Sequence, residues 1–149
     1  MNRKRFIRSI LAAPLAAAIR LNAAGPQVQV YKTPTCSCCS KWVQHLRANG
    51  FQVSVQDVAE TVVYRRKYGV PEALLSCHTA VVEGYSLEGH VPASDIQRLL
   101  RERPKAKGLA VPGMPVGSPG MESTRSEAYA VMIFDDEGRS SVYQRYPRK

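Results

Sequence analysis

Residues 33–39 read Thr-Pro-Thr-Cys-Ser-Cys-Cys and hold three of the four cysteines of this 149-residue chain. A β-like run at residues 28–31 precedes them, and a helical pattern of apolar residues follows them. Cys36 and Cys39 therefore have C-x-x-C spacing at a strand-to-helix junction, which is typical of redox-active cysteine pairs. Cys38 is an additional thiol inside that motif.

The start of the predicted helix favours reactive thiolates. We expect Thr35 to be the N-cap, so that the first turn offers unpaired N–H groups and the positive end of the helix dipole. Such a position stabilises a thiolate, which is both the nucleophile and the metal ligand. Cys36 and Cys39 share a helix face, whereas Cys38 points elsewhere on the same turn and could bind a further ion. The alternative is a structural disulfide between two of the three cysteines.

Hydrophobic periodicity predicts a mixed α/β fold for the chain after residue 24. Gly and Pro mark the boundaries between alternating strand patterns and helical patterns. The predicted strands are residues 28–31, 51–55, 79–82 and 86–91, and the predicted helices are residues 36–49, 61–68 and 92–103. The resulting order, β-α-β-α-β-β-α, resembles the thioredoxin fold over residues 27–103.

The thioredoxin resemblance gives Cys77-His78 a place beside the first cysteines. In thioredoxin-like proteins a cis-proline precedes the third strand and lies against the C-x-x-C motif, and His78 stands at that proline position here. The resemblance therefore implies that a fourth cysteine and a histidine lie beside residues 36–39. Convergent thiol and imidazole groups are typical of metal sites. The alternative is that this pair only packs at the start of a strand.

Residues 104–127 are rich in Pro and Gly, so we expect a long loop there. Met114 and Met121 lie in near-repeats of Pro-Gly-Met within it. Thioethers are soft ligands that suit Cu(I), although methionines could instead pin the loop to the core. A final β-hairpin is predicted at residues 128–135 and 140–146. The predicted division of the chain is an export signal at residues 1–24, a thioredoxin-like domain at 25–103, and a C-terminal extension at 104–149 that contributes to the metal site.

The first 24 residues are predicted to be an export signal. Residues 3–8 carry four basic side chains, an Ala-rich apolar segment follows, and small residues at 23–25 offer a cleavage zone. The basic region resembles a twin-arginine signal with Lys4 in place of the second arginine, so the Sec and twin-arginine routes both stay open. The segment is too short to span a bilayer, and we expect a periplasmic protein without stable membrane insertion. The alternative is an amphipathic N-terminal helix on the mature domain.

The charge distribution argues against a nucleic-acid partner. The formal net charge is +9, but five basic residues and no acidic residue precede Gly25, so the remainder carries only +4. No basic stripe with interleaved aromatic residues is present. No heptad pattern or exposed apolar helix face argues for a dimer, so we expect a monomer.

The candidate metal ligands form a soft, sulfur-rich set. They are four thiolates, one imidazole and two thioethers, from Cys36, Cys38, Cys39, Cys77, His78, Met114 and Met121. Such a set suits Cu(I), or Zn²⁺ if only a Cys₃His site forms. Zinc leaves the methionines unused, so copper is the stronger prediction. The donors exceed the needs of one tetrahedral ion, and bridging thiolates could hold several ions. His45 falls off the apolar helix face and is expected to face solvent rather than a metal.

Several motifs together resemble the CopG-type periplasmic copper-resistance proteins. They are the C-x-C-C motif of residues 36–39 with Trp42, the Ser-Cys-His-Thr of residues 76–79, and the Pro-Gly-Met loop of residues 112–121. The resemblance covers residues 28–146. It implies a thioredoxin domain whose C-terminal extension contributes to metal binding, and a cysteine-bridged copper cluster of several ions beside the C-x-C-C motif. It also implies a role in interconverting Cu(I) and Cu(II) alongside a copper efflux system.

We therefore predict an exported, thioredoxin-like copper-binding protein of copper resistance, and leave open whether it is an enzyme. One alternative is a periplasmic thiol–disulfide oxidoreductase that uses Cys36 and Cys39 alone. Another is a copper chaperone or store, which would use the same ligands and hand ions to an efflux partner without redox chemistry. A structural zinc module is the weakest alternative.

Overall fold

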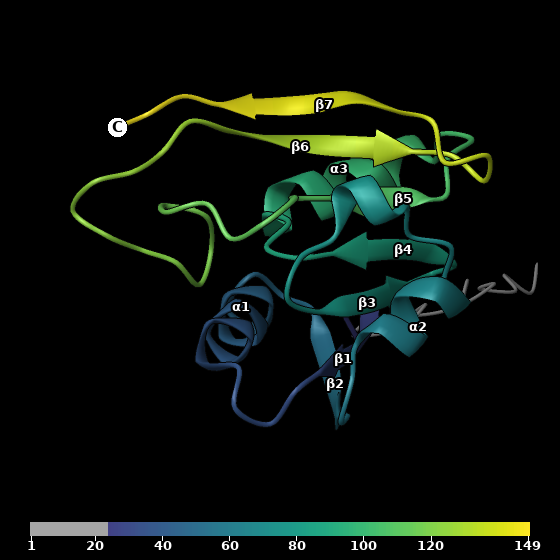
Figure 1. Ribbon diagram of the computed structural model, residues 1–149, viewed down its shortest axis with the longest axis horizontal. Coiled ribbons are helices and arrows are strands. Elements are labelled where there is room, and N and C mark those ends of the chain that lie inside the picture. Colours follow the sequence, from purple (N-terminus) through teal and green to yellow (C-terminus); the bar gives the residue numbers. More distant parts are fainter. Residues whose placement is uncertain (1–23) are drawn as a thin grey trace, which may run out of the picture.

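Seven strands form one mixed sheet in the computed structural model, which describes residues 24–149 (Figure 1). The strands are β1 (Gln27–Lys32), β2 (Gln52–Asp57), β3 (Thr79–Val82), β4 (Tyr85–Glu88), β5 (Gly108–Ala110), β6 (Tyr129–Phe134) and β7 (Ser140–Tyr146). The helices are α1 (Ser37–Ala48), α2 (Val62–Lys67) and α3 (Ala93–Glu102), with a short 3-10 helix η1 (Glu72–Leu74). The predicted export signal, residues 1–24, lies outside the described residues apart from Ala24. Among the described residues, no helix combines the length and the apolar character that a membrane crossing needs.

The predicted mixed α/β fold is confirmed, and so is the order β-α-β-α-β-β-α from β1 to α3. The strands lie side by side in the order β2-β1-β3-β4-β5-β6-β7. β1 is parallel to β2 and antiparallel to β3, and β3 and β4 form an antiparallel hairpin. The likeness of this unit to thioredoxin itself stays a prediction.

The prediction of an unbroken loop over residues 104–127 is wrong at residues 108–110. These residues form β5, which pairs in parallel with β4 and antiparallel with β6. Three residues are too few to show a strand periodicity, and their conformation is set by the two strands beside them. Gly108 allows this close pairing, because a Cβ atom there would collide with the backbone of Ser86. The predicted terminal hairpin is confirmed as β6 and β7, and it extends the same sheet.

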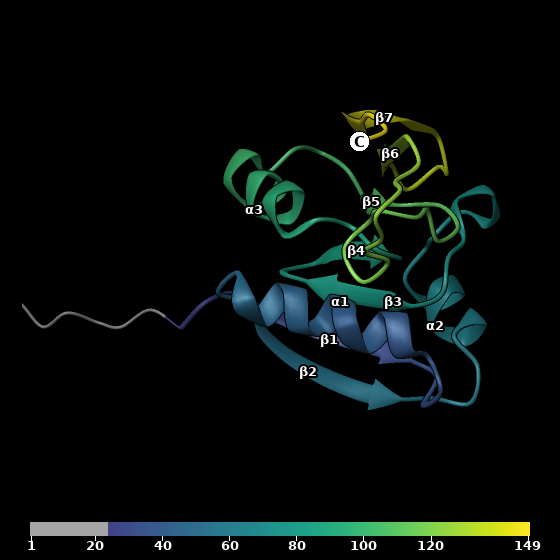
Figure 2. The same cartoon turned by 90° about the vertical axis from the view of Figure 1, so that its left-hand side faces the viewer.

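Helices α1 and α3 share the main hydrophobic core with the sheet. Trp42 of α1 and Ile96 of α3 are fully buried in it, and Figure 2 shows α1 lying along the sheet in front of β1 and β3. Successive strand residues face opposite sides of a sheet. Leu109 therefore joins this core, whereas Ala110 joins a smaller cluster that includes Leu74 of η1.

The N-terminus of α1 is capped by a cysteine and not by Thr35, so that prediction is wrong. Cys36 is the N-cap, and its sulfur accepts the backbone N–H of Cys39 at 3.3 Å. The residues before it form a tight turn, in which the N–H of Cys36 donates to the carbonyl of Thr33. This turn places the Cys36 sulfur, rather than the threonine hydroxyl, over the free N–H groups of the helix. The predicted helix end is confirmed, since Asn49 is the C-cap and Gly50 follows it with a φ of +86°.

The loop between β5 and β6 reaches back across the molecule to α1 (Figure 1). Gly120 of this loop has a φ of +97° and lies against the helix backbone. A Cβ atom at Gly120 would lie 2.6 Å from the carbonyl oxygen of Cys38 and 3.1 Å from the backbone nitrogen of Trp42. Only glycine allows this approach. It brings residues 111–128, the methionine loop, to the first turns of α1.

We expect Gly120→Ala to destabilise the protein by about 3 kcal/mol, because it adds a steric collision to the strain of a left-handed backbone. Gly84→Ala is the matched control: Gly84 also has a positive φ, of +87°, but no atom lies within 4 Å of a Cβ built there. That control should cost about 1–2 kcal/mol. Urea unfolding of the metal-free proteins measures both values. Equal losses would show that the loop does not press on α1.

Candidate metal centre

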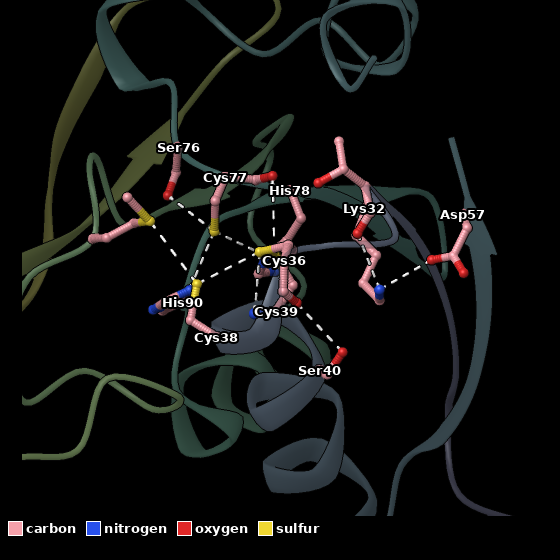
Figure 3. The surroundings of a disulfide bond; sticks show 12 residues. Lys32, Cys36, Cys38, Cys39, Ser40, Asp57, Ser76, Cys77, His78 and His90 are labelled. Atoms are coloured by element: carbon pink, nitrogen blue, oxygen red, sulfur yellow. Dashed lines mark hydrogen bonds and ion pairs between the residues drawn. A yellow bond between two sulfur atoms is a disulfide. The ribbon is translucent and has the colours of Figure 1, made fainter. Parts of the chain in front are cut away.

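The four cysteines meet at the N-terminus of α1 (Figure 3). Cys36, Cys38 and Cys39 come from the start of the helix, and Cys77 comes from the segment that precedes β3. Their sulfur atoms all lie within 4.8 Å of one another, and those of Cys36 and Cys38 are 3.5 Å apart. The predicted convergence of the C-x-C-C motif with the fourth cysteine is therefore present in the structure.

Two of these cysteines form a disulfide. Cys36 and Cys39 are bonded, with their Cα atoms 5.3 Å apart, while Cys38 and Cys77 are free. A thiolate is the metal ligand, so the two sulfurs of the bonded pair bind metal only after reduction. The centre therefore has a disulfide form with two free thiols and a reduced form with four.

Two buried histidines lie beside Cys77. The Cys77 sulfur lies 3.3 Å from Nδ1 of His78 and 3.2 Å from Nε2 of His90. Both imidazoles are fully buried, and the His78 ring packs against Trp42 with ring centres 4.3 Å apart. These three side chains form a second donor group, which shares Cys77 with the group of four sulfurs.

His90 is a site residue that the sequence analysis did not select. The β3–β4 hairpin pairs Thr79 with Glu88, and the N–H of Gly89 donates to the carbonyl of His78 at 2.9 Å. Continuing this register by two residues places His90 opposite Cys77. The predicted strand at residues 86–91 already contained His90. Pairing it about the turn signal at residues 83–84 and continuing past Thr79 could therefore have placed His90 opposite Cys77.

The two predicted methionines lie on the exposed side of the centre. The Met114 sulfur is 3.9 Å from the sulfur of Cys38, and the Met114 residue is 50% exposed. Met121 lines a surface hollow together with Cys38, Lys41 and Gly120. The loop between β5 and β6 thus brings Met114 beside Cys38 and Met121 to the hollow next to it.

His45 does not face solvent, so that expectation is wrong. Its imidazole is half-buried, and Nε2 accepts the backbone N–H of Ala93 at 3.0 Å. Pro92 is the N-cap of α3 and provides no side-chain hydrogen bond to the helix, so His45 supplies the missing acceptor from α1. Its burial lowers the pKa of His45. His45 has a structural role at α3 and belongs to neither donor group.

The solved structures that resemble this chain decide its family. Two forms of a protein named copper resistance protein copG match it with TM-scores of 0.77 and 0.79 and sequence identities of 47% and 46%. The alignments cover 81% and 83% of this chain, and 97% and 99% of the respective relatives. The chain belongs to the CopG copper-resistance protein family. The resemblance inferred from the sequence is therefore confirmed.

A second comparison covers part of the same region. The family model described as "Protein of unknown function, DUF411" matches residues 74–121. This segment contains Cys77, both buried histidines of the centre, and both predicted methionines. No protein with a curated description matches the chain.

Burial sets the protonation of the inner donors in this CopG-family chain. It raises the pKa of Cys77 to about 12, and the nearby Cys38 sulfur adds to that shift. It lowers the pKa of His78 to about 3, with a further contribution from His90, and it also lowers the pKa of His90. At neutral pH the metal-free centre therefore holds a Cys77 thiol and two neutral imidazoles. Among these three inner donors, a metal ion would displace the thiol proton of Cys77 and no proton from the imidazoles.

The donor set fits a copper ion. Soft thiolates and thioethers suit Cu(I), and imidazole suits copper in either state. The Nε2 atom of His78 is buried without a hydrogen-bond partner among the described residues. Leaving such a group unpaired costs about 1–3 kcal/mol, so the site keeps an unfavourable polar group where stability alone would favour an apolar one.

A buried ion pair holds the Cys77 segment in place. Glu88 is fully buried and accepts hydrogen bonds from the N–H of Ser76 (2.7 Å), the hydroxyl of Thr79 (2.7 Å) and Nε of Arg65 (2.9 Å). Arg65 also donates to the carbonyl of Ser76 at 2.9 Å. The residues on both sides of Cys77-His78 are thereby anchored to β4 and α2.

We expect Glu88→Gln to destabilise the metal-free protein by about 3 kcal/mol, because it leaves the Arg65 guanidinium buried without its counter-charge. The control is Glu83→Gln, in the turn of the same hairpin. It removes an exposed carboxylate that pairs with Arg103, the C-cap of α3, and should cost less than about 1 kcal/mol. Urea unfolding at pH 7 measures both. Similar small losses in the two variants would show that the buried pair does not support the site.

Acid should destabilise the fold through His78. Unfolded His78 takes up a proton below pH 6.5, whereas in the folded protein its pKa is about 3. Stability is therefore lost as the pH falls from 6.5 to 3, by up to about 5 kcal/mol. In His78→Phe, which keeps a ring against Trp42, this part of the loss should vanish. Urea unfolding of both metal-free proteins at several pH values tests this, and parallel pH curves would contradict it.

Proposed function

We propose that this chain is a copper-binding protein of copper resistance that holds several copper ions in a cysteine-bridged cluster. The observation that carries the proposal is that two donor groups, one of four cysteines and one of Cys77, His78 and His90, share the Cys77 sulfur. A thiolate has lone pairs enough to bind two ions. Cys77 is therefore suited to bridge an ion among the sulfurs to an ion among the imidazoles.

Copper accounts for more of these donors than zinc does. A closed zinc site needs four ligands, and Cys₃His would satisfy it. Cys36, Cys38, Cys39, Cys77 and His78 already exceed that number, and His90 adds a further imidazole. In our proposal Met114 and Met121 complete or cover the cluster, because thioethers are ligands for Cu(I). The names of the related solved structures, copper resistance proteins, support the same choice.

We also propose that the protein interconverts Cu(I) and Cu(II). The exposed side of the centre offers sulfur alone, which favours Cu(I), and the buried side adds two nitrogens that suit Cu(II) as well. The Cys36–Cys39 pair could supply electrons for this step. When two thiols close into a disulfide they release two electrons and two protons, which is enough to reduce two Cu(II) ions to Cu(I). Cys36 and Cys39 then leave the ligand set, while Cys38, Cys77 and the two imidazoles remain as ligands.

The cellular setting of the proposal follows from the sequence. The segment at residues 1–24 would export the chain to the periplasm, where the monomer would work beside a copper efflux system. The C-terminal extension, residues 104–149, would act as part of the metal site through the loop that brings Met114 beside Cys38.

A second candidate function is thiol–disulfide exchange. The observation in its favour is the Cys36–Cys39 disulfide at the start of α1, where a helix N-terminus lowers thiol pKa values in general. This function gives no role to Cys38, Cys77 or the two buried histidines. A copper chaperone or store would use every donor, but it would release copper in the state in which it was bound.

The deciding experiment is metal analysis with absorption spectroscopy on reduced protein loaded with Cu(I) without oxygen. We expect several copper ions per chain, and a loss of at least half of them in Cys38→Ser, whereas Ser37→Ala on the same turn should keep the full number. Insulin-disulfide reduction by the metal-free protein is measured in parallel. Less than one copper per chain, with insulin reduction retained in Cys38→Ser, would favour the oxidoreductase.

Oxidation of the copper-loaded protein separates the redox function from storage. The spectrum should change on adding an oxidant and return on adding a reductant, with the copper content constant. Loss of the metal during the first cycle would favour a chaperone or store.

A further inference from the structure

Ser118 is a buried polar residue in the methionine loop that points at the metal centre. It closes a turn in which its N–H donates to the carbonyl of Pro115 at 3.1 Å. Its hydroxyl oxygen lies 2.7 Å from the same carbonyl oxygen and 3.1 Å from Nδ1 of His90. Ser118 is fully buried, so water does not compete for these bonds.

The hydrogen bonds of this hydroxyl determine where the His90 proton sits. A carbonyl oxygen only accepts, so the single hydroxyl hydrogen of Ser118 is donated to Pro115. The hydroxyl oxygen can then only accept from His90, which requires a hydrogen on Nδ1. A neutral imidazole carries one N–H, so Nε2 keeps a free lone pair. That atom is the one that lies 3.2 Å from the Cys77 sulfur.

We propose that Ser118 is a positioning residue, which fixes His90 as the Nδ1–H tautomer and holds its Nε2 lone pair toward Cys77. Groups of this kind orient a ligating imidazole from behind, and their loss typically lowers metal affinity 10–100-fold. That His90 binds copper rests on the proposed function, whereas its tautomer in the metal-free protein does not. The methionine loop thus contributes a hydroxyl to the centre as well as thioethers.

His78 provides an internal contrast. Its Nδ1 faces the Cys77 sulfur at 3.3 Å, and its Nε2 has no partner among the described residues. No hydroxyl comparable to that of Ser118 selects its tautomer within the part of the chain that the structure describes. The two imidazoles therefore present different nitrogens to one sulfur, and only His90 is held by a hydrogen bond from behind.

The tautomer can be measured directly by NMR on the reduced, metal-free protein with ¹⁵N-labelled histidine. The chain has three histidines, so His45→Gln and His78→Phe assign the signals. We expect a pyrrole-type shift for Nδ1 of His90 and a pyridine-type shift for Nε2. Ser118→Ala should shift both toward a mixture of tautomers, and Ser118→Thr, which keeps a hydroxyl, should restore the original pattern.

Copper affinity is the second readout, measured by competition with a chromogenic Cu(I) chelator. Ser118→Ala should bind copper about 10–100-fold more weakly than the unmodified protein. Ser118→Thr, which keeps the hydroxyl, should lose less affinity. Ser123→Ala, an exposed serine in the same loop, should leave the affinity unchanged. If Ser118→Ala fails to fold, the tautomer of His90 in the unmodified protein and in Ser118→Thr still tests the role of Ser118.

The outcomes separate this proposal from the proposed function. An Nε2–H tautomer for His90 in the unmodified protein, or identical ¹⁵N shifts in Ser118→Ala, would overturn the role of Ser118. Failure of the unmodified protein to bind copper, with the expected tautomer present, would overturn the proposed function and the ligand role of His90 while the orienting hydrogen bond stands.

Discussion

The buried Arg65–Glu88 ion pair is the interaction on which the metal centre depends. Two opposite charges in an apolar interior are tolerated only when their hydrogen-bonding groups are satisfied, and here the partners come from Ser76 and Thr79. That requirement fixes the backbone on both sides of Cys77. The fourth cysteine therefore approaches α1 on a segment tied to β4 and α2. Such support suits a ligand that must lie within a few ångströms of three other sulfurs.

The centre has two chemically distinct sides that meet at Cys77. On the outer side, Cys38 and Met114 offer polarizable sulfur near solvent. On the inner side, His78 and His90 are buried, and the loss of hydration keeps them neutral. An ion bound outside would be held by soft donors, and one bound inside by a mixture of sulfur and nitrogen. This asymmetry is the physical basis of the proposal that both oxidation states of copper are accommodated.

The loop between β5 and β6 acts through several small residues as well as through its methionines. Gly120 allows it to lie on the backbone of α1, and the Pro115 turn directs Ser118 to the back of His90. In the sequence this segment resembles an irregular Pro- and Gly-rich connection. In three dimensions it brings Met114 beside Cys38 and Ser118 beside His90.

Local patterns were sufficient for most of the fold and for the candidate ligands that lie in sequence motifs. Alternating and helical periodicity predicted the order of elements from β1 to α3 and the terminal hairpin, because each depends on burial of one face of a single segment. The C-x-C-C motif and Cys77-His78 were also visible in the sequence. β5, the cap at Cys36, His90 and Ser118 were missed. Each of these depends on backbone or side-chain groups brought together from separate segments: β5 needs two neighbouring strands, and Ser118 matters only because a hairpin register places His90 in front of it. Periodicity reports which face of a segment is buried, whereas the choice of hydrogen-bond partner is made only when the segments pack.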